Sequence, residues 1–347
     1  MKRFYFRAIS LLLFLSFVLL ALTGCKDEEP ERQARSYYTF FDTKTVVFSY
    51  LGDSEEDFKA NCDAVEDLLD EWHKMLDIYY EYSGINNLRT LNKNAGKGPV
   101  KLDGRLIDFL LYAKEVYALT DGRVNIAFGS VLSLWHDERD AAKDNPEAAK
   151  LPSAAALAEA SMHTDLSSLV IDKENSTAEI TDPKMKLDVG ALGKGYAAEA
   201  AAELLRERGV TSYVLNVGGN IICIGEKTNG EGWVTGITNP DKTSEDYAAK
   251  ITLKDVACVT SGDYERYYTV EGKNYHHIID PDTLFPANYF SSITVLCGNS
   301  ALADALSTAL FCMSYEDGLA LVNSLGGVDV LWIKSDGTQY KTNGFDR

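Results

Sequence analysis

The chain has 347 residues and a formal net charge of −18 at pH 7. Such an acidic surface repels nucleic acid and gains nothing from an anionic bilayer, which argues against nucleic-acid-binding proteins and electrostatically bound membrane proteins. An anionic ligand would need local positive charge from a metal ion, a lysine or a helix N-terminus.

Residues 1–24 have the layout of a secretory signal peptide. Three basic residues, Lys2, Arg3 and Arg7, precede an apolar run that is shorter than the roughly 20 residues of a membrane-spanning helix. The run ends in Leu-Thr-Gly followed by Cys25. This resembles the lipobox of bacterial lipoproteins, in which the cysteine receives a lipid through its thiol. An uncleaved anchor helix is the alternative, and both place the protein outside the cytoplasm, tethered to a membrane.

Residues 25–38 form a charged stretch that predicts a solvated polar linker. The remainder, residues 39–347, suffices for one large domain or two intimate lobes. The six cysteines include no Cys-x-x-Cys pair and no Cys/His cluster, which argues against a zinc site. Apolar, strand-like surroundings predict buried free thiols at Cys223, Cys258 and Cys297.

The predicted elements mix helices and strands without a strict alternation. Apolar periodicity predicts helices over residues 55–80, 106–119, 154–162, 196–208 and 302–313, with a charged surface stretch at 137–147. Residues 170–172 and 177–181 predict a hairpin, and further strands are expected at 213–217, 221–224, 233–237, 256–260, 267–270, 275–279, 292–297 and 328–333. The last of these is expected to end the sheet. This order predicts an α+β fold, a mixed sheet with packed helices, rather than a doubly wound sheet.

A glycine-rich segment over residues 187–196 runs straight into a predicted helix and contains Asp188 and Lys194. Glycines let the backbone approach a ligand closely, and a helix N-terminus offers free N–H groups and a positive dipole. These are the features that a pyrophosphate needs on an acidic protein. The spacing is not that of a Walker A loop. A glycine-rich turn before a structural helix is an equally good interpretation of this segment alone.

Gly218 and Gly219 follow a predicted strand. Two glycines at that position indicate either a tight hairpin or a floor beneath a flat ring or a phosphate, and the residues alone favour the hairpin.

A predicted strand delivers Thr260, Ser261 and Gly262 to one point, and His277 follows in a His-Ile-Ile-Asp-Pro sequence. His277 is the nearby group with a neutral-range pKa, which makes it the natural proton acceptor. The alternative is a histidine held by Asp280 in a turn.

Asp304 and Thr308 are four residues apart in a predicted helix of small apolar residues, so they project from one face. A carboxylate and a hydroxyl suit Mg²⁺, which is usually bound by few protein ligands plus substrate phosphate. The alternative is that Asp304 is a helix cap or an exposed acid.

Taken in order, these four motifs resemble the ApbE family of FAD:protein FMN transferases, from about Phe41 to the C-terminal strands. The resemblance implies the fold of that family, FAD as substrate and Mg²⁺ as cofactor. It also implies transfer of the FMN moiety onto a Thr or Ser hydroxyl of an acceptor flavoprotein, with release of AMP.

The resemblance also implies roles for individual residues. His277 would be the catalytic base, and Mg²⁺ would be bound by the Ala191 carbonyl, Asp304 and Thr308, with Ser307 beside them. The FAD contacts implied by the matching motifs are Asp188, Lys194, Gly218, Gly219, Thr260, Ser261, Gly262 and Ile279.

Three segments depart from the family pattern. Phe41-Asp42-Thr43 stands where the family has Met-Gly-Thr. Arg123, Val124 and Asn125, expected to contact FAD, include Asn125 in place of the usual aspartate. Tyr79 is the best match to the family's tyrosine over the isoalloxazine, with Tyr80 and Tyr82 as competitors.

Two other functions fit parts of the pattern. A Mg²⁺-dependent FAD pyrophosphatase, in which water replaces the acceptor hydroxyl, would use the same site. A lipid-anchored flavin carrier would need neither metal nor base, so the presence of Asp304, Thr308 and His277 argues against it. The expected location is the extracytoplasmic face of the cell membrane.

Overall fold

The computed structural model describes residues 32–50 and 54–346. The expected signal peptide and Cys25 lie outside the described residues. An eight-stranded sheet, in which every neighbouring pair is antiparallel, has the order β1-β2-β6-β7-β10-β13-β14-β15. Its strands are β1 (Arg32–Phe40), β2 (Thr43–Tyr50), β6 (Ser212–Val217), β7 (Asn220–Gly225), β10 (Val256–Gly262), β13 (Ser292–Cys297), β14 (Asp329–Ile333) and β15 (Gln339–Lys341). Together with the helices, this confirms the α+β prediction, but the sheet is antiparallel throughout and not mixed.

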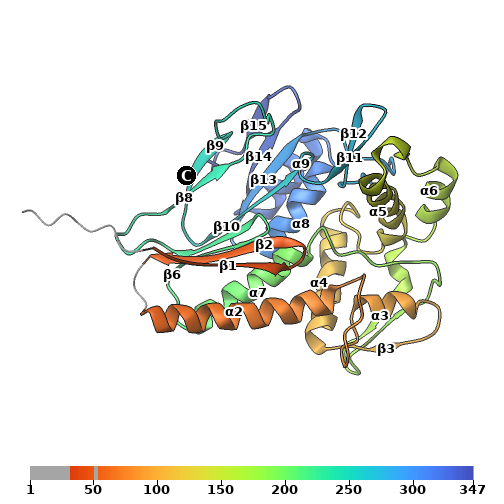
Figure 1. Cartoon of the computed structure of the whole chain (residues 1–347), viewed down its shortest axis with the longest axis horizontal. Coiled ribbons are helices and arrows are strands. Elements are labelled where there is room, and N and C mark those ends of the chain that lie inside the picture. The colour runs from red at the N-terminus through yellow and green to blue at the C-terminus, as the bar shows by residue number, and fades with distance from the viewer. Residues whose placement is uncertain (1–31, 51–53, 347) are drawn as a thin grey trace, which may run out of the picture.

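Both faces of the central strands are covered. Helices α2 (Glu55–Leu76), α7 (Gly193–Glu207) and α8 (Ser300–Phe311) pack on one face (Figure 1). On the other face, the hairpin of β8 (Trp233–Ile237) and β9 (Ala249–Leu253) packs against a separate apolar cluster. All six residues of β13 are therefore buried, including the polar Ser292 and Thr294.

Helices and short strands beside the main sheet form a second lobe (Figure 1). It contains α3 (Leu88–Lys93), α4 (Gly104–Leu119), α5 (Gly129–Asp144) and α6 (Ala154–Ser161), with a small sheet of β3 (Val100–Lys101), β5 (Thr177–Ile180) and β4 (Leu169–Asp172). A hairpin of β11 (Tyr267–Val270) and β12 (Lys273–His276) packs on α5, and α9 (Tyr315–Leu325) follows α8.

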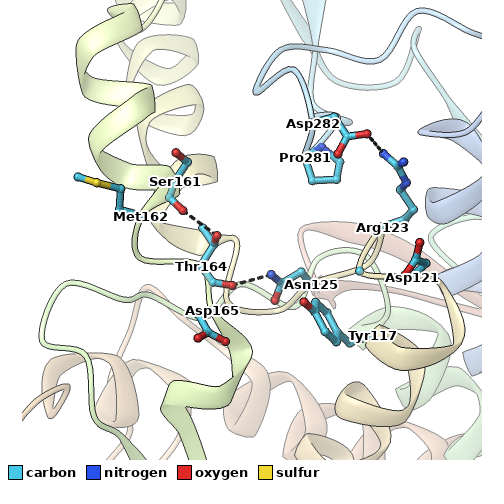
Figure 2. A pocket seen from close by; sticks show the side chains of 11 residues that line it. Tyr117, Asp121, Arg123, Asn125, Ser161, Met162, Thr164, Asp165, Pro281 and Asp282 are labelled. Atoms are coloured by element: carbon cyan, nitrogen blue, oxygen red, sulfur yellow. Dashed lines mark hydrogen bonds and ion pairs between the residues drawn. The ribbon is translucent and has the colours of Figure 1, made fainter.

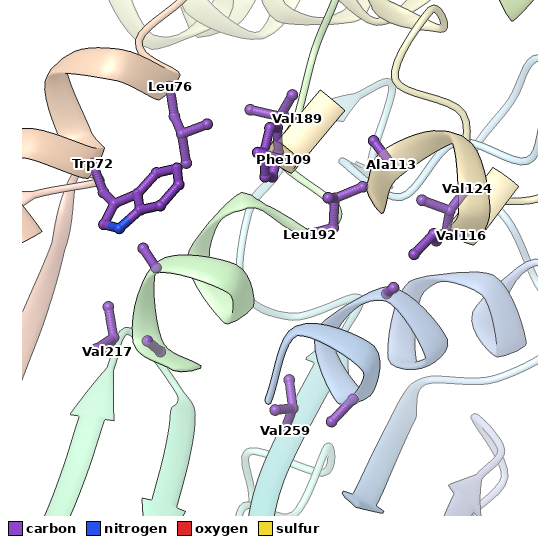
Figure 3. Close-up of a cluster of buried hydrophobic side chains, with 14 of the residues drawn as sticks. Trp72, Leu76, Phe109, Ala113, Val116, Val124, Val189, Leu192, Val217 and Val259 are labelled. Carbon is purple, nitrogen blue, oxygen red and sulfur yellow. The ribbon is translucent and has the colours of Figure 1, made fainter. Parts of the chain in front are cut away.

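One apolar core joins the two lobes. Trp72 of α2, Phe109 of α4 and Leu192 before α7 belong to the same buried cluster (Figure 3). Because Leu192 belongs to this cluster, the 187–196 segment enters α7 between the two lobes, with packed elements on both sides.

Among the described residues, no helix has the length and apolar character needed to cross a membrane.

The structure contains α3, α9, β2 and β9, for which the sequence analysis predicted no element, and it differs from the stated predictions elsewhere. Most of residues 137–147 are helical, because α5 buries its apolar first half and exposes a charged second half that hides the helical period. Strand β1 begins at Arg32, inside the predicted linker, and as an edge strand it buries few side chains. Strand β12 ends at His276 instead of continuing to Ile279. Strand β15, and not β14, is the final strand of the sheet.

Candidate functional site

Helices α7 and α8 meet at Gly195 and Asp304. The Gly195 amide donates a hydrogen bond to Asp304 Oδ2 at 2.7 Å, and Lys194 Nζ lies 3.7 Å from Asp304 Oδ1. A Cβ at Gly195 would lie 2.4 Å from Asp304 Cβ, so only glycine permits this approach. Asp304 is buried and is not the helix cap, which is Asn299. Burial raises the pKa of Asp304, and the Lys194 charge and the Gly195 amide oppose that rise.

Strand β10 brings hydroxyls to the same helix. Ser261 Oγ lies 2.7 Å from Ser307 Oγ, and the Ser307 hydroxyl also donates to the Asp304 carbonyl at 2.9 Å. Thr260 Oγ1 lies 2.9 Å from Thr294 Oγ1 on β13. The Thr-Ser-Gly motif is therefore joined to the Asp304 helix through Ser261, while Thr260 turns to the neighbouring strand.

His277 is held in a defined tautomer. Its Nδ1 lies 3.2 Å from the Arg266 carbonyl oxygen, which can only accept, so in the neutral ring Nδ1 carries the proton and Nε2 keeps its lone pair. Burial lowers the pKa of His277 to about 3, with help from the charges of Arg266 and Lys194. The ring is thus neutral at pH 7, and Nε2 is the available proton acceptor.

The adjacent His276 has both ring nitrogens engaged. Nε2 lies 2.8 Å from the Ala287 carbonyl oxygen, and Nδ1 accepts from the Ile278 amide at 3.2 Å. His276 therefore has no ring lone pair free to accept a proton, whereas the adjacent His277 has one at Nε2.

Asp280 does not hold His277, contrary to the alternative interpretation of the turn. Asp280 Oδ1 lies 3.6 Å from Arg123, which also pairs with Asp282. Arg123 and Asn125 line a polar cavity of about 460 Å³ between α6 and the 281–282 turn (Figure 2).

The side chains of the segment from Arg123 to Asn125 make different kinds of contact. The Asn125 side chain accepts from the Ala127 amide at 2.9 Å and donates to the Thr164 carbonyl at 2.8 Å. Val124 is buried in the main core (Figure 3), so its side chain is a packing residue and any ligand contact would come from its backbone. Ile279 is likewise buried, in the cluster beneath α5.

Tyr79 is linked to Asp188 by His136, a histidine of α5. Tyr79 Oη is 3.2 Å from His136 Nδ1, which is 3.9 Å from Asp188 Oδ2. Partial desolvation of the phenol and the Asp188 carboxylate raise the pKa of Tyr79 to about 12. Tyr82 donates instead to Asp77 at 2.7 Å. The contacts thus link Tyr79 to the glycine-rich segment through His136, whereas the Tyr82 hydroxyl is bound to Asp77, and this favours Tyr79.

Gly218 and Gly219 form the two-residue turn of the β6–β7 hairpin, with φ of 57° and 94°. A Cβ at Gly218 would lie 2.5 Å from the Thr43 side chain. The turn therefore packs against the Phe41-Asp42-Thr43 turn, and the hairpin interpretation is confirmed. The Phe41 amide faces His73 Nδ1 at 3.4 Å.

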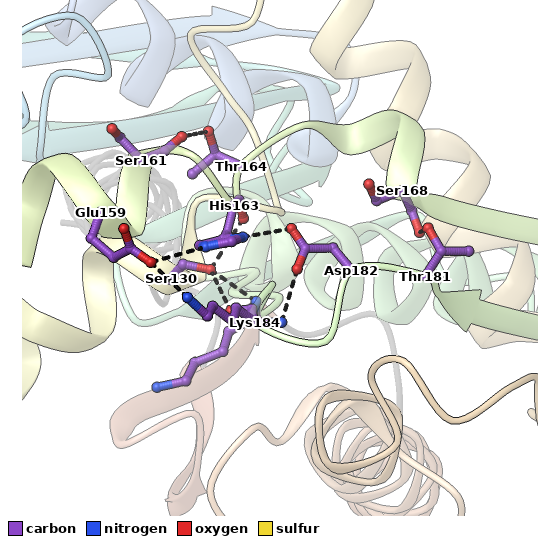
Figure 4. A network of polar contacts seen from close by, with 10 residues as sticks. Ser130, Glu159, Ser161, His163, Thr164, Ser168, Thr181, Asp182 and Lys184 are labelled. Carbon is purple, nitrogen blue, oxygen red and sulfur yellow. Dashed lines mark hydrogen bonds and ion pairs between the residues drawn. The ribbon is translucent and has the colours of Figure 1, made fainter.

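A polar network anchors the approach to Asp188 (Figure 4). The Ser130 hydroxyl accepts from the Lys186 amide at 3.0 Å, and His163 Nδ1 lies 2.7 Å from Asp182 Oδ2. A Cβ at Gly129 would lie 2.5 Å from the Lys186 carbonyl oxygen. The start of α5 and the segment before Asp188 are thus held in close contact.

The residues around Asp304 fit a hard cation. Its carboxylate is desolvated, and its Oδ1 lies 3.7 Å from the Lys194 ammonium, so a cation there would lower the cost of the buried charge. Thr308 is one helical turn onward and partly exposed. Among the described residues no group of three His, Cys, Asp or Glu side chains could hold a metal, so the remaining ligands would be hydroxyls, carbonyls, water or phosphate oxygens, which suit Mg²⁺.

Sequence reasoning missed His136 and Arg139. Both line a small cavity together with His277. They lie in α5, residues 129–144. Their three-residue spacing, which places them on one face of a helix, was the signal that could have identified them. The charged end of α5 hid the helix.

The sequence of this chain is similar to those of known proteins. The pattern of the ApbE family matches residues 40–332. The FAD:protein FMN transferase of Treponema pallidum is 34% identical over 263 residues, covering 72% of this chain and 71% of that protein. One from Klebsiella pneumoniae is 26% identical, covering 92% and 91%.

Solved structures share the fold. The ApbE protein of Thermotoga maritima superposes with a TM-score of 0.79 at 26% identity, covering 91% of this chain and 100% of that one. The flavin transferase ApbE of Vibrio cholerae gives a TM-score of 0.74 at 25% identity, covering 91% and 98%.

Proposed function

Because the chain belongs to the ApbE family, we propose that it is an FAD:protein FMN transferase. It takes FAD as substrate and moves the FMN moiety onto a Thr or Ser hydroxyl of an acceptor flavoprotein. The observation that carries the proposal is the contact of Lys194 with Asp304 where α7 meets α8, with His277 within reach of the Lys194 charge. Lys194 lies against Asp304, and its charge is also one cause of the lowered pKa of His277.

In this proposal the chain's own groups bind the pyrophosphate and move one proton. Lys194 and the positive dipole at the N-terminus of α7 attract the phosphate oxygens. His277 Nε2 accepts the proton of the acceptor hydroxyl. The hydroxyl oxygen forms a bond to the FMN-side phosphorus, and the bond from that phosphorus to the AMP oxygen breaks.

Asp304, Thr308, the Ala191 carbonyl and the neighbouring Ser307 are the proposed Mg²⁺ site. Bound there, Mg²⁺ would neutralise charge that develops on the pyrophosphate and the departing AMP. Asp304 supplies the charged ligand, and the small residues around it exclude water.

An assay with FAD, Mg²⁺ and an acceptor domain tests the proposal. Covalent flavin is detected by in-gel fluorescence, and free FMN by chromatography. We expect acceptor-bound flavin together with AMP. Free FMN and AMP without labelled acceptor would identify an FAD pyrophosphatase, and binding of FAD without turnover would identify a carrier.

We also propose that the protein is a lipoprotein anchored through Cys25 on the extracytoplasmic face of the membrane. The support is the basic, apolar and Leu-Thr-Gly-Cys order of residues 1–25. Cys25→Ala should release the protein from the membrane fraction and abolish its lipid modification. A Cys25→Ala protein that remains membrane-bound after signal cleavage would contradict this proposal.

A further inference from the structure

Tyr79 is held at its backbone and at its hydroxyl, although the residue is 55% exposed. Its backbone amide donates to Asp77 Oδ1 at 2.6 Å, and its hydroxyl lies 3.2 Å from His136 Nδ1. Asp77 ends α2 and His136 belongs to α5, so the ring is held between two elements that are far apart in sequence. A fixed ring with an exposed surface is a platform for a flat aromatic ligand.

His136 is itself held in place between this ring and the glycine-rich segment. Its Nδ1 lies 3.9 Å from Asp188 Oδ2, and its side chain is 21% exposed. It lines one small cavity with Arg139 and His277. Burial lowers the pKa of His136, against the Asp188 charge, so the imidazole is neutral and can exchange a hydrogen bond with a phenol in either direction.

We propose that His136 is a positioning residue that fixes Tyr79 in the orientation in which its ring receives the isoalloxazine of FAD. This inference rests on the proposed function and deepens it. An exposed tyrosine loses rotamer freedom when a ring stacks on it, and a hydrogen bond formed before the ligand arrives removes that cost from binding.

Tyr80 provides the matched comparison. It is 70% exposed, and within residues 32–50 and 54–346 its hydroxyl makes no hydrogen bond, while its amide also donates to Asp77 Oδ1, at 3.0 Å. The two tyrosines therefore differ mainly in the contact with His136. Tyr80→Phe should leave FAD binding unchanged, whereas Tyr79→Phe should weaken it.

Three substitutions at His136 distinguish loss of the hydrogen bond to Tyr79 from loss of side-chain volume. His136→Asn places an amide close to where Nδ1 lies, His136→Gln places its amide nearer to Nε2, and His136→Ala removes both. The lost hydrogen bond should raise the KM for FAD by about three- to tenfold in the Ala and Gln variants. We expect kcat to change less than twofold, and the Asn variant to stay near wild type. Quenching of bound FAD fluorescence should fall together with the rise in KM.

A double-mutant cycle completes the test. In a Tyr79→Phe background, His136→Ala should have no further effect on KM, because the contact is already lost. Additive effects, or an Asn variant as impaired as the Ala variant, would overturn the inference while the transferase function stands. If wild-type protein neither binds FAD nor labels an acceptor, the proposed function fails and this inference fails with it. Circular dichroism of each variant identifies misfolding, and in that case the Asn and Gln comparison decides.

Discussion

At the scale of single residues, Asp304 has a structural and a chemical role. One carboxylate oxygen accepts from the Gly195 amide at 2.7 Å and so satisfies an N–H at the start of α7. The other faces Lys194 at 3.7 Å. An amide side chain can accept the first contact and cannot supply the negative charge of the second, so substitution separates the two roles.

Asp304→Asn should keep the fold and lose Mg²⁺-dependent activity. The Gly195 contact survives and a desolvated charge disappears, so we expect the unfolding free energy to stay within about 1 kcal/mol of wild type. Asp304→Ala should cost about 1–3 kcal/mol, because the Gly195 amide is left unpaired. Denaturant unfolding and Mg²⁺ titration measure the two effects. Raised Mg²⁺ should partly restore transfer in these variants. Full activity of the Asn variant at low Mg²⁺ would contradict the metal role.

His277→Asn should abolish transfer without loss of ligand binding. Its amide can still donate to the Arg266 carbonyl, as Nδ1 does at 3.2 Å, but it has no base at the Nε2 position. Loss of a general base typically costs about 10²–10⁴ in rate. FAD and Mg²⁺ affinity should remain near wild type, and added Mg²⁺ should not restore the rate. Near-full transfer would place the base elsewhere.

The pH dependence differs from that of an ordinary histidine. A histidine with a pKa near 6.5 predicts a rate that changes between about pH 6 and 8 when His277 titrates. The pKa of His277 is instead lowered to about 3 by burial and neighbouring positive charge. His277 is therefore unprotonated throughout that range, and its titration contributes no change in rate there in the free enzyme.

At the scale of elements, the contact of α7 with α8 depends on one glycine. Gly195→Ala would place a methyl group 2.4 Å from Asp304 Cβ and 2.6 Å from the Ser300 carbonyl oxygen. Neither neighbour is a flexible chain end, so the helices must separate. We expect a loss of about 1–3 kcal/mol or more in unfolding free energy, together with loss of activity.

Gly104→Ala is the matched control for that variant. Gly104 begins α4, and a Cβ there meets no atom within 4 Å. Its thermal midpoint should be unchanged or slightly raised, because alanine favours helix more than glycine does. Equal melting temperatures of the Gly195 and Gly104 variants would show that α7 and α8 tolerate separation.

At the scale of the whole molecule, three histidines with lowered pKa values lie near the site. Burial lowers the pKa of His136, His276 and His277. Between the folded and unfolded pKa values, the unfolded chain binds more protons than the folded one, so their contribution to stability falls as pH decreases below about 6.5.

Acid unfolding should therefore be milder in the His277→Asn variant. At pH 5, protonation of one unfolded histidine costs the folded state at most about 2 kcal/mol relative to pH 7.5. We expect wild type to lose more unfolding free energy than the variant between these two pH values, measured by urea denaturation. A parallel decline of both proteins would mean that His277 titrates normally.

The sequence predicted much of the fold where one physical signal dominated. The long helix α2, the β4–β5 hairpin and strand β13 were predicted with bounds close to those observed. Helix α5 was missed because its second half is charged, and β1 because an edge strand buries too little to show a period. An apolar period appears in a sequence only where one face of the element is buried, and the second half of α5 and most of β1 are exposed.

Sequence alone established which chemical groups the chain carries and in what order. The glycine-rich entry to a helix, the Thr-Ser-Gly strand and the Asp304–Thr308 spacing are local properties, because short-range geometry fixes them. The tertiary structure decided how they combine. It placed Asp304 on the Gly195 amide, fixed the tautomer of His277 through Arg266, and brought His136 to Tyr79. These contacts join residues 11 to 109 positions apart, and they depend on how the helices pack and on burial, which shifts pKa values; no local pattern encodes either.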